Sequence, residues 1–571
     1  MAEIYPTPSP TVHKYEPYPE KKYPPFTKRD TLFAALFGVS SFLLIDFGTK
    51  GFHFGFSIFY LFHLLITALY GHKKGKKPTA FAVLCGLLSL LAAFTLTVGN
   101  DTLVNFLTII LVGGLYGMFT LGVTHTFTSG QGSFKICIDF AKDAFAATFS
   151  DIGLVFGSVK HSSKKNKKAV SSALGVLVAL PVVAVIVPLL IKSDAAFEGL
   201  MDNIAANIGI YLLEIFGALI ILPYVFAYVF GKNNREISAD KKKGTHSRPI
   251  PASGCVSFLA VISALYLVYL FSQLAYFFSA FKGILPDDYR YSASSFARRG
   301  FFEMFAICLI NLTVLSLVGA FYKRDNKKSI LSVKCLSLFI SAFTVMLIVC
   351  AMQKMRLNIS IFGLSENRVL VSVFMVMLLV ISAFFVLHIF LPKLPYMQSI
   401  IIICSVIFVA VGFADIDSRI AEYNVSAYTS GKLDTIDVTE LKNLGDGGID
   451  ALIELTSVPD KKVSQKALDT LASTAVNNYG NDIKIEERKA TIIYGNSDFR
   501  SYCQSHEKAK KSLANYYNSM SEDNKLVFDN RLMVLDNTNF TYDEDYGAYY
   551  RFSDDALFKL DKSTNLYKKQ S

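Results

Sequence analysis

The stretch that decides the fold is Phe296-Ala-Arg-Arg-Gly-Phe-Phe-Glu-Met-Phe-Ala-Ile-Cys-Leu-Ile-Asn311, which runs from a polar loop directly into an apolar segment. It carries two arginines, a glutamate and an asparagine at or inside the boundary of a candidate membrane span. Such groups are costly inside a membrane unless they meet partners or water. The stretch therefore indicates a membrane protein whose polar groups are held at specific places.

Working outward from this stretch, the apolar residues gather into runs long enough to cross a bilayer. The chain has 571 residues, 52% of them hydrophobic, and a mean hydropathy of +0.39. A helix needs roughly 20 apolar residues to cross the hydrocarbon layer. The expected spans are 31–47, 54–70, 79–98, 102–123, 169–191, 207–230, 255–280, 301–322, 331–352, 369–390 and 397–413. We expect an all-α fold, a polytopic transmembrane helix bundle of about 11 spans.

Three further segments complete the expected domain organisation. Residues 1–30 hold seven of the seventeen prolines and are expected to be a disordered Pro/Tyr-rich tail. Residues 31–413 form the transmembrane domain. Within it, 130–158 has apolar residues at helical spacing and resembles an amphipathic helix on the inner surface, although an ordinary basic flank explains it equally well. Residues 414–571 are expected to form a small, mostly helical soluble domain with a partly extended end.

The charge distribution predicts an orientation. Residues 414–571 hold 20 Lys and Arg against 26 Asp and Glu, whereas 1–413 hold 37 against 20. A basic half full of apolar spans favours contact with the anionic lipids of an inner leaflet rather than with nucleic acid. With a cytoplasmic N-terminus, the inner loops carry 27 Lys and Arg and the outer loops 9. Eleven spans then put the C-terminal domain outside the cytoplasm, and one span more or fewer would reverse its side.

Two groups of polar residues are candidates for a functional role. Asp46 and Glu214 are acids within expected spans. A second group belongs to loops and span ends on the expected outer side, with Asp415 and Asp417 among the available counter-charges. The residues of this candidate polar cluster are Asp194, Arg298, Arg299, Glu303, Asn311, Glu366 and Arg368. Arg299 and Glu303 are four residues apart and can pair on one helix face. Both groups can be read as the lining of a substrate path or as structural clamps.

Motifs of soluble enzymes and cofactor sites are absent from the sequence. It contains no H-E-x-x-H, P-loop or G-x-S-x-G pattern and no convincing dinucleotide fingerprint. The eight cysteines form no C-x-x-C pair and mostly lie in apolar runs. The sequence therefore predicts no catalytic residue, no metal ligand and no cofactor.

The opening stretch also carries a family resemblance. With Ser193–Phe197, Phe362–Arg368 and Asp415–Asn424, it resembles the bacterial multi-pass families catalogued as domains of unknown function 4173 and 4153, over roughly residues 190–425. The resemblance implies a polytopic protein of a bacterial inner membrane, often with a soluble tail. It implies no activity, cofactor or catalytic residue.

Three functions remain open at this point. An envelope or signalling accessory protein, with an unidentified protein partner, predicts a closed bundle whose polar groups are satisfied pairwise. A transporter or channel predicts a water-accessible cavity that reaches Glu214. A membrane-embedded enzyme acting on lipid or cell-wall precursor predicts a cleft with several convergent acids.

Overall fold

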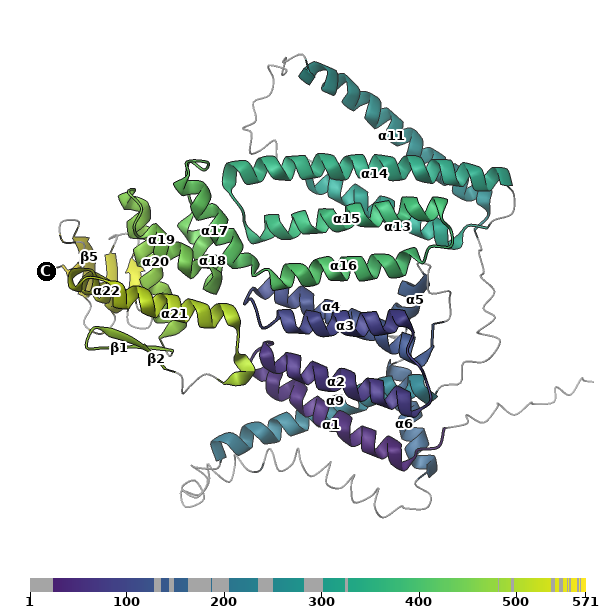
Figure 1. Ribbon diagram of the computed structural model, residues 1–571, viewed down its shortest axis with the longest axis horizontal. Coiled ribbons are helices and arrows are strands. Elements are labelled where there is room, and N and C mark those ends of the chain that lie inside the picture. Colours follow the sequence, from purple (N-terminus) through teal and green to yellow (C-terminus); the bar gives the residue numbers. More distant parts are fainter. Residues whose placement is uncertain are drawn as a thin grey trace, which may run out of the picture.

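The computed structural model describes most of the chain. The described residues are 24–127, 135–142, 148–162, 186, 205–234, 250–281, 301–323, 327–480, 482–493, 498–535, 540–543, 548–551, 553, 556–561, 564 and 566–570. Most of the expected Pro-rich tail and the expected span 169–191 lie outside them. The fold is mostly helical, as predicted: a bundle of long apolar helices carries a small C-terminal region of helices and short sheets (Figure 1).

The long helices follow the apolar runs of the sequence. They are α1 (Lys28–Thr49), α2 (Phe54–Lys73), α3 (Ala80–Thr95), α4 (Thr102–Thr124), α9 (Ala205–Asn234), α11 (Ala252–Phe281), α13 (Phe301–Phe321), α14 (Lys327–Phe362), α15 (Glu366–Phe390) and α16 (Tyr396–Phe413). Among the described residues, nine helices are long and apolar enough to cross a membrane, and α3 is apolar but shorter. The chain is therefore a multi-pass membrane protein by the length and composition of its helices.

The bundle consists of two groups of helices joined through α16. In one group α1 packs on α2 and α9, and α3 packs on α4. In the other, α14 packs on α11, α13 and α15. Helix α16 lies between them, against α3 on one side and α15 on the other (Figure 1). The apolar cores of the groups are built from residues such as Phe37, Leu96, Leu315 and Ile340, all fully buried.

Helix α14 is longer than the span expected from the sequence. Its 36 residues cover about 54 Å at 1.5 Å per residue, against about 30 Å of hydrocarbon. The expected span ended at 352, but no Pro or Gly interrupts the polar residues that follow. The helix ends at Gly363, whose φ of +73° suits glycine and whose N–H donates to Ile359 O.

The described part of segment 130–158 forms two helices rather than one. Helix α5 (Lys135–Lys142) and helix α6 (Thr148–Ser162) lie at the end of the bundle remote from the C-terminal domain (Figure 1). Ile136 of α5 is buried in the core of α3 and α4, and α6 packs on α9. Their position on a membrane surface stays a prediction.

The C-terminal domain, residues 414–570, is a helical core with two small sheets. Its helices are α17 (Ile416–Thr429), α18 (Val438–Asn443), η3 (Gly445–Gly448), α19 (Ile449–Leu455), α20 (Lys461–Tyr479), η5 (Phe499–Ser501), α21 (Gln504–Ser519) and α22 (Glu522–Val534). Their core includes Leu452, Leu471, Leu513 and Phe528 and extends to Val104 of the bundle. The shared core indicates that the domain is packed onto the bundle.

The two sheets are antiparallel. Strands β1 (Ile483–Glu486) and β2 (Lys489–Ile492) form a hairpin. Strands β3 (Phe540–Asp543), β4 (Ala548–Arg551), β5 (Ala556–Asp561) and β6 (Leu566–Lys569) form a meander in that order. The hairpin was not predicted from the sequence, because both turn residues, Glu487 and Arg488, have positive φ without the Asn-Gly or Asp-Gly signal.

Candidate functional site

The C-terminal domain is seated on one end of the bundle by backbone hydrogen bonds. The chain entering α21 runs past the end of α3, where Gln504 N–H donates to Thr97 O at 2.7 Å and Ser505 N–H donates to Val98 O at 2.9 Å. At the start of α2, Phe54 N–H donates to Tyr502 O at 3.4 Å. These docking contacts bring together segments about 400 residues apart in the chain (Figure 1).

An ion pair reinforces the docking. Arg500 of η5 contacts the carboxylate of Asp46, near the end of α1, at 2.5 Å, and its Nε donates to Asp498 at 2.7 Å. The side chains of Arg500 and Asp46 are 19% and 9% exposed. Hydrogen bonds to Asp498 and Asp46 raise the pKa of Arg500 above its ordinary value. Asp46 is thus a partner of the C-terminal domain.

Glu214 lies beside this ion pair. Thr49, the last residue of α1, donates its hydroxyl to Glu214 Oε1 at 3.4 Å. Within the described residues, Glu214 Oε2 is buried and has no hydrogen-bond partner. The structure therefore brings Asp46 and Glu214 together at the end of the bundle where the C-terminal domain docks.

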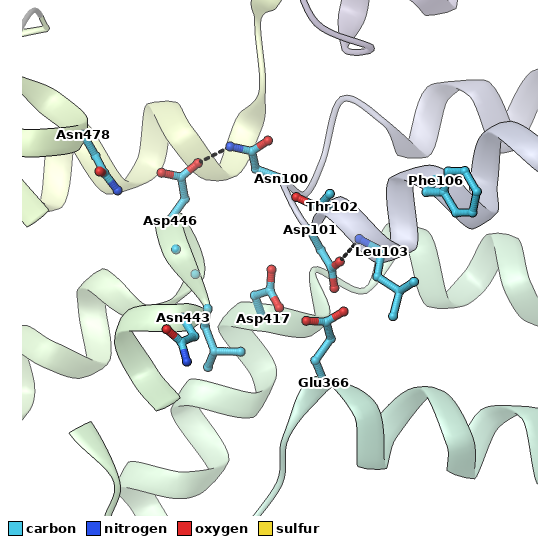
Figure 2. A pocket seen from close by; sticks show the side chains of 13 residues that line it. Asn100, Asp101, Thr102, Leu103, Phe106, Glu366, Asp417, Asn443, Asp446 and Asn478 are labelled. Atoms are coloured by element: carbon cyan, nitrogen blue, oxygen red, sulfur yellow. Dashed lines mark hydrogen bonds between the residues drawn. The ribbon is translucent and has the colours of Figure 1, made fainter. Parts of the chain in front are cut away.

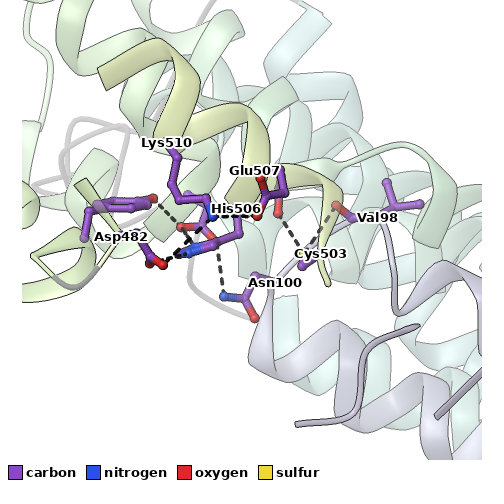
Figure 3. A network of polar contacts seen from close by, with 10 residues as sticks. Val98, Asn100, Asp482, Cys503, His506, Glu507 and Lys510 are labelled. Atoms are coloured by element: carbon purple, nitrogen blue, oxygen red, sulfur yellow. Dashed lines mark hydrogen bonds and ion pairs between the residues drawn. The ribbon is translucent and has the colours of Figure 1, made fainter. Parts of the chain in front are cut away.

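His506 of α21 organises a network of acids at the same end of the bundle (Figure 3). Its Nδ1 lies 3.1 Å from Asp446 and its Nε2 lies 3.2 Å from Asp482. Tyr479 stacks on the imidazole and donates its hydroxyl to Asp446, and Asn100 donates to the same carboxylate at 3.1 Å. Asp446 is therefore fully partnered.

The pKa values of this network reflect the pairing. Burial alone would raise the pKa of Asp446, but hydrogen bonds from His506, Tyr479 and Asn100 hold it below its ordinary value. The hydrogen bond with Asp446 raises the pKa of His506 despite partial burial. The two groups stabilise each other as an imidazolium–carboxylate pair.

Cys503 and His506 line one cleft at this end of the bundle, but Cys503 does not have the properties of a nucleophile. Its thiol is buried and lies 3.7 Å from Val98 O and 3.2 Å from Ser505 Oγ. Burial is the main reason that its pKa is raised, and a thiol held protonated is a poor nucleophile. His506 is engaged with two carboxylates instead. The arrangement lacks the thiolate–imidazole pair of a cysteine enzyme.

A second cleft, which we call the acidic cleft, opens next to this network (Figure 2). Its volume is about 480 Å³. Its walls come from the α3–α4 loop and the start of α4, the first residue of α15, and the helices α17, η3 and α20. The residues lining it are Asn100, Asp101, Thr102, Leu103, Phe106, Glu366, Asp417, Asn443, Leu444, Gly445, Asp446, Gly447 and Asn478. Four are acids, and none is Lys, Arg or His.

Asp417 is the most confined acid of the cleft. It is 8% exposed, and within the described residues its carboxylate has no hydrogen bond or ion pair. Burial, followed by the charges of Asp101, Glu366, Asp415 and Asp446, raises the pKa of Asp417 to about 8. Gly447 permits this close packing, because a Cβ there would lie 2.5 Å from Asp417 Cβ.

The neighbours of Asp417 include a second incompletely satisfied carboxylate. Asp101 Oδ1 caps α4 by accepting from Leu103 N–H at 2.8 Å and Val104 N–H at 2.9 Å. No N–H or hydroxyl group of the described residues donates to the buried Asp101 Oδ2, and its neighbour is Glu366, whose pKa is raised by burial, by the charge of Asp101 and by a carboxyl–carboxyl hydrogen bond with it. Figure 2 shows its carboxylate facing that of Glu366, with Asp417 beside them. The cleft therefore concentrates negative charge.

The four described members of the predicted polar cluster lie at different places in the structure. Glu366 lines the acidic cleft, whereas Arg368 on the same helix donates to Phe362 O and Gly363 O. Asn311 is buried inside the bundle, where Tyr266 donates to it and it donates to Thr344 Oγ1 at 3.0 Å. Glu303 is exposed at the start of α13. Asp194, Arg298 and Arg299 lie outside the described residues, so the pairing of Arg299 with Glu303 stays a prediction.

Several residues of the site escaped the sequence analysis. Asp417 was proposed as a counter-charge for arginines, yet it faces other acids. Asp101, Asp446, Arg500 and His506 were not singled out, although the Asp-Gly-Gly turn after Asp446 signals a tight approach. Among the described residues, no group of three or more His, Cys, Asp or Glu side chains is placed to hold a metal ion.

Comparison with known proteins assigns a family without an activity. Neither the curated proteins nor the solved structures contain a significant match. The family model described as "Domain of unknown function (DUF4153)" matches residues 79–455, from α3 to the end of α19. This match covers Asp101, Glu366, Asp417 and Asp446 and is wider than the resemblance seen in the sequence, but the expected likeness to family 4173 is not shown. Because the match covers about two thirds of the chain, the protein belongs to the DUF4153 family of domains of unknown function.

Proposed function

We propose that this protein is an accessory protein of the bacterial cell envelope, in which the bundle holds the C-terminal domain at one membrane surface and presents the cleft between them to a ligand or partner. The docking contacts carry the proposal. Gln504, Ser505 and Tyr502 bond to the bundle through backbone groups, and Arg500 bonds to Asp46. A domain fixed in this way can pass a change at the cleft to the helices.

The interior of the bundle supports a closed structure. His63 hydrogen-bonds with Ser40 at 2.8 Å and Tyr116 at 2.9 Å, and Lys232 donates to Thr120 at 3.1 Å. Asn311 is held between two other helices. Polar groups satisfied pairwise across helices are typical of packing contacts rather than of a conduction path.

We further propose that the C-terminal domain lies outside the cytoplasm. The loops that lead into α2, α4 and α15 are at the same end as this domain, and Lys50 is their only Lys or Arg over 50–53, 99–101 and 363–365. Loop 74–79, which holds three lysines, and Lys323, Lys327 and Lys328 lie at the other end. The positive-inside rule then assigns the lysine-rich end to the cytoplasm and to its anionic lipids.

Accessibility of introduced cysteines tests this orientation. Cys503 is a poor reporter because it is 3% exposed. Thr435→Cys in an exposed loop of the C-terminal domain and Lys393→Cys in the α15–α16 loop are matched reporters at opposite ends. In a background without the eight native cysteines, an impermeant thiol reagent should label Thr435→Cys in intact cells and Lys393→Cys only after lysis. The reverse pattern would place the domain in the cytoplasm.

A transporter is the second candidate, because Glu214 Oε2 is a buried acceptor without a partner within the described residues. Proteoliposomes that enclose a pH-sensitive dye test this role. We expect wild-type protein and the Glu214→Gln variant to show the same background proton flux under an imposed potential. A proton flux that is present in the wild-type protein and absent in Glu214→Gln would contradict the accessory function and favour transport.

A further inference from the structure

We propose that the acidic cleft binds a small organic cation with two or more ammonium groups, of the polyamine class. The proposal deepens the proposed function and rests on it in one respect: the C-terminal domain must be docked, because α17, η3 and α20 of that domain complete the cleft. It is carried by the charge of the lining, by Asp417 and by the size of the cleft.

The charge of the lining is one-sided. Asp101, Glu366, Asp417 and Asp446 come from four separate elements, and the lining contains no Lys, Arg or His. Asp446 is neutralised from behind by His506, but no basic side chain lies at hydrogen-bond distance from the other three carboxylates among the described residues. Converging like charges raise the free energy of the empty cleft, and a cation placed among them lowers it.

Asp417 supplies an independent observation. A buried carboxylate ordinarily receives hydrogen bonds, because an unsatisfied one loses its hydration without compensation. Asp417 is 92% buried, lacks a partner within the described residues and faces the cleft between Asp101, Glu366 and Asp446 (Figure 2). Asp101 Oδ2 is a second oxygen to which no N–H or hydroxyl group of the described residues donates, and its neighbour is the carboxyl of Glu366. An ammonium group offers only donors and can supply the missing hydrogen bonds.

The size of the cleft selects the kind of cation. A volume of about 480 Å³ lies in the range of sites for small organic molecules. In the described part of the chain, no group of three or more His, Cys, Asp or Glu side chains is placed to hold a metal ion. An extended cation can place one ammonium group near Asp417 and another near a second carboxylate. The amides of Asn443 and Asn478 and the ring of Phe106 also line the cleft and can contact its chain.

Binding should be linked to the release of a proton. The free cleft holds Asp417 largely protonated at neutral pH, since its pKa is about 8. An ammonium group favours the carboxylate form and lowers this pKa. Affinity should therefore rise with pH between about 6 and 8, and the observed binding enthalpy should depend on the ionisation enthalpy of the buffer.

Calorimetric titration of the full chain with spermidine tests the proposal. The protein is placed in phosphatidylcholine nanodiscs at pH 7.5, and empty nanodiscs give the background. Asp417→Asn and Glu366→Gln each replace an ionisable carboxyl by an amide with little change of shape, and we expect each to weaken binding at least tenfold. Asp434→Asn and Glu454→Gln are matched controls at exposed positions of the C-terminal domain, and we expect affinities within twofold of wild type. MgCl₂ and CaCl₂ are titrated in parallel.

The outcomes separate this proposal from the proposed function. Spermidine binding that the cleft variants abolish and the controls retain supports the proposal. Binding of Mg²⁺ or Ca²⁺ with the same pattern, without spermidine binding, overturns it in favour of a metal site. Absence of spermidine binding, or unchanged binding by Asp417→Asn, also overturns it. Limited proteolysis is the second readout: a resistant C-terminal domain leaves the proposed function standing, whereas a freely cleaved one overturns both.

Discussion

Two sets of acids lie at the docked end of the bundle, and their surroundings are opposite. On the side of α21, Asp446 and Asp482 meet His506, and Asp46 and Asp498 meet Arg500. In the acidic cleft, Asp417 meets only other acids within the described residues. Both arrangements lie a few residues from the same loop, 99–101. The contrast separates acids whose ion pairs hold the C-terminal domain on the bundle from acids that remain free to bind a ligand.

The direction of the pKa shifts expresses the same contrast. Asp446 has a lowered pKa despite burial, because three donors favour its charged form. Asp417 has a raised pKa, because burial and neighbouring charges disfavour its charged form. Paired carboxylates stabilise the docked state near neutral pH, whereas Asp417 destabilises it. A side chain that lowers the stability of the folded state in this way is typical of functional sites rather than of purely structural contacts.

The largest effect is expected from breaking the paired side at Arg500. Arg500→Met leaves Asp46 and Asp498 without their cation, and a partly buried carboxylate that loses its partner costs about 2–3 kcal/mol. Pulse proteolysis of the C-terminal domain over a urea series measures the change in its unfolding free energy. Arg419→Met is the matched control, since the pair of Arg419 with Glu422 is 73% exposed on both sides and is worth at most about 0.5 kcal/mol. Equal losses of unfolding free energy in both variants would contradict the docking role of Arg500.

The next largest effect comes from replacing Asp by Asn once among the paired acids and once in the acidic cleft. The two changes in unfolding free energy should have opposite signs. Asp446→Asn loses charge-assisted hydrogen bonds with His506 and should lower the unfolding free energy by about 1–2 kcal/mol. Asp417→Asn removes a carboxyl that the folded state must either keep protonated or hold ionised beside other acids, and should raise the unfolding free energy by at least about 1 kcal/mol at pH 7.5. The same urea series measures both, with Asp434→Asn as control. Equal losses of unfolding free energy in both variants would show that the carboxylate of Asp417 has hydrogen-bond partners in the protein.

The sequence predicted the parts of the fold that depend on local composition. Runs of apolar residues define spans such as α15 and α16, because all residues of a span lie in the same apolar surroundings and composition alone therefore identifies it. The extension of α14 escaped prediction because a polar helix beyond the hydrocarbon looks like a loop by hydropathy. The short sheets lack turn signals and depend on tertiary packing.

The site could be predicted only in fragments. Glu366 and Asp46 were found because acids at the ends of apolar spans are conspicuous. Their surroundings were not, because Asp46 meets Arg500 across 454 residues and Asn100 meets Asp446 across 346. Asp101 looks in the sequence like any helix N-cap, and only the arrangement of the domains reveals its unused second oxygen.

The pH dependence of docking is a smaller effect that isolates Asp417. The unfolded chain ionises Asp417 above about pH 4, whereas the folded protein keeps the proton up to about pH 8, so the folded state binds more protons between these values. Stability should fall as pH rises through this window, by at most about 1.4 kcal/mol per pH unit. His506 has a raised pKa, so its contribution is complete below about pH 6.5 and is lost above it. Asp446, with a lowered pKa, loses its contribution only in acid.

The window between about pH 5 and 6 therefore reports Asp417, because His506 is protonated there in both states. Asp417→Asn should flatten the slope of unfolding free energy in this window, and His506→Gln should keep it. The groups that face Asp417 are Asp101, Glu366, Asp415 and Asp446, all acids. A slope that survives in Asp417→Asn would assign the titration to another group, such as Glu366, whose pKa is raised by burial and by Asp101.

The smallest effect is expected at the loop shared by the two clefts. Asn100 lines both and donates one exposed hydrogen bond to Asp446 at 3.1 Å. Asn100→Ala should cost about 0.5 kcal/mol in the urea series, since His506 and Tyr479 still satisfy Asp446. Spermidine affinity should change less than threefold, because every carboxylate of the acidic cleft remains. A loss of spermidine affinity as large as that of Asp417→Asn would mean that the Asn100 amide itself contacts the ligand. The loop 99–101 would then belong both to the paired acids that dock the domain and to the unpaired acids that bind the cation.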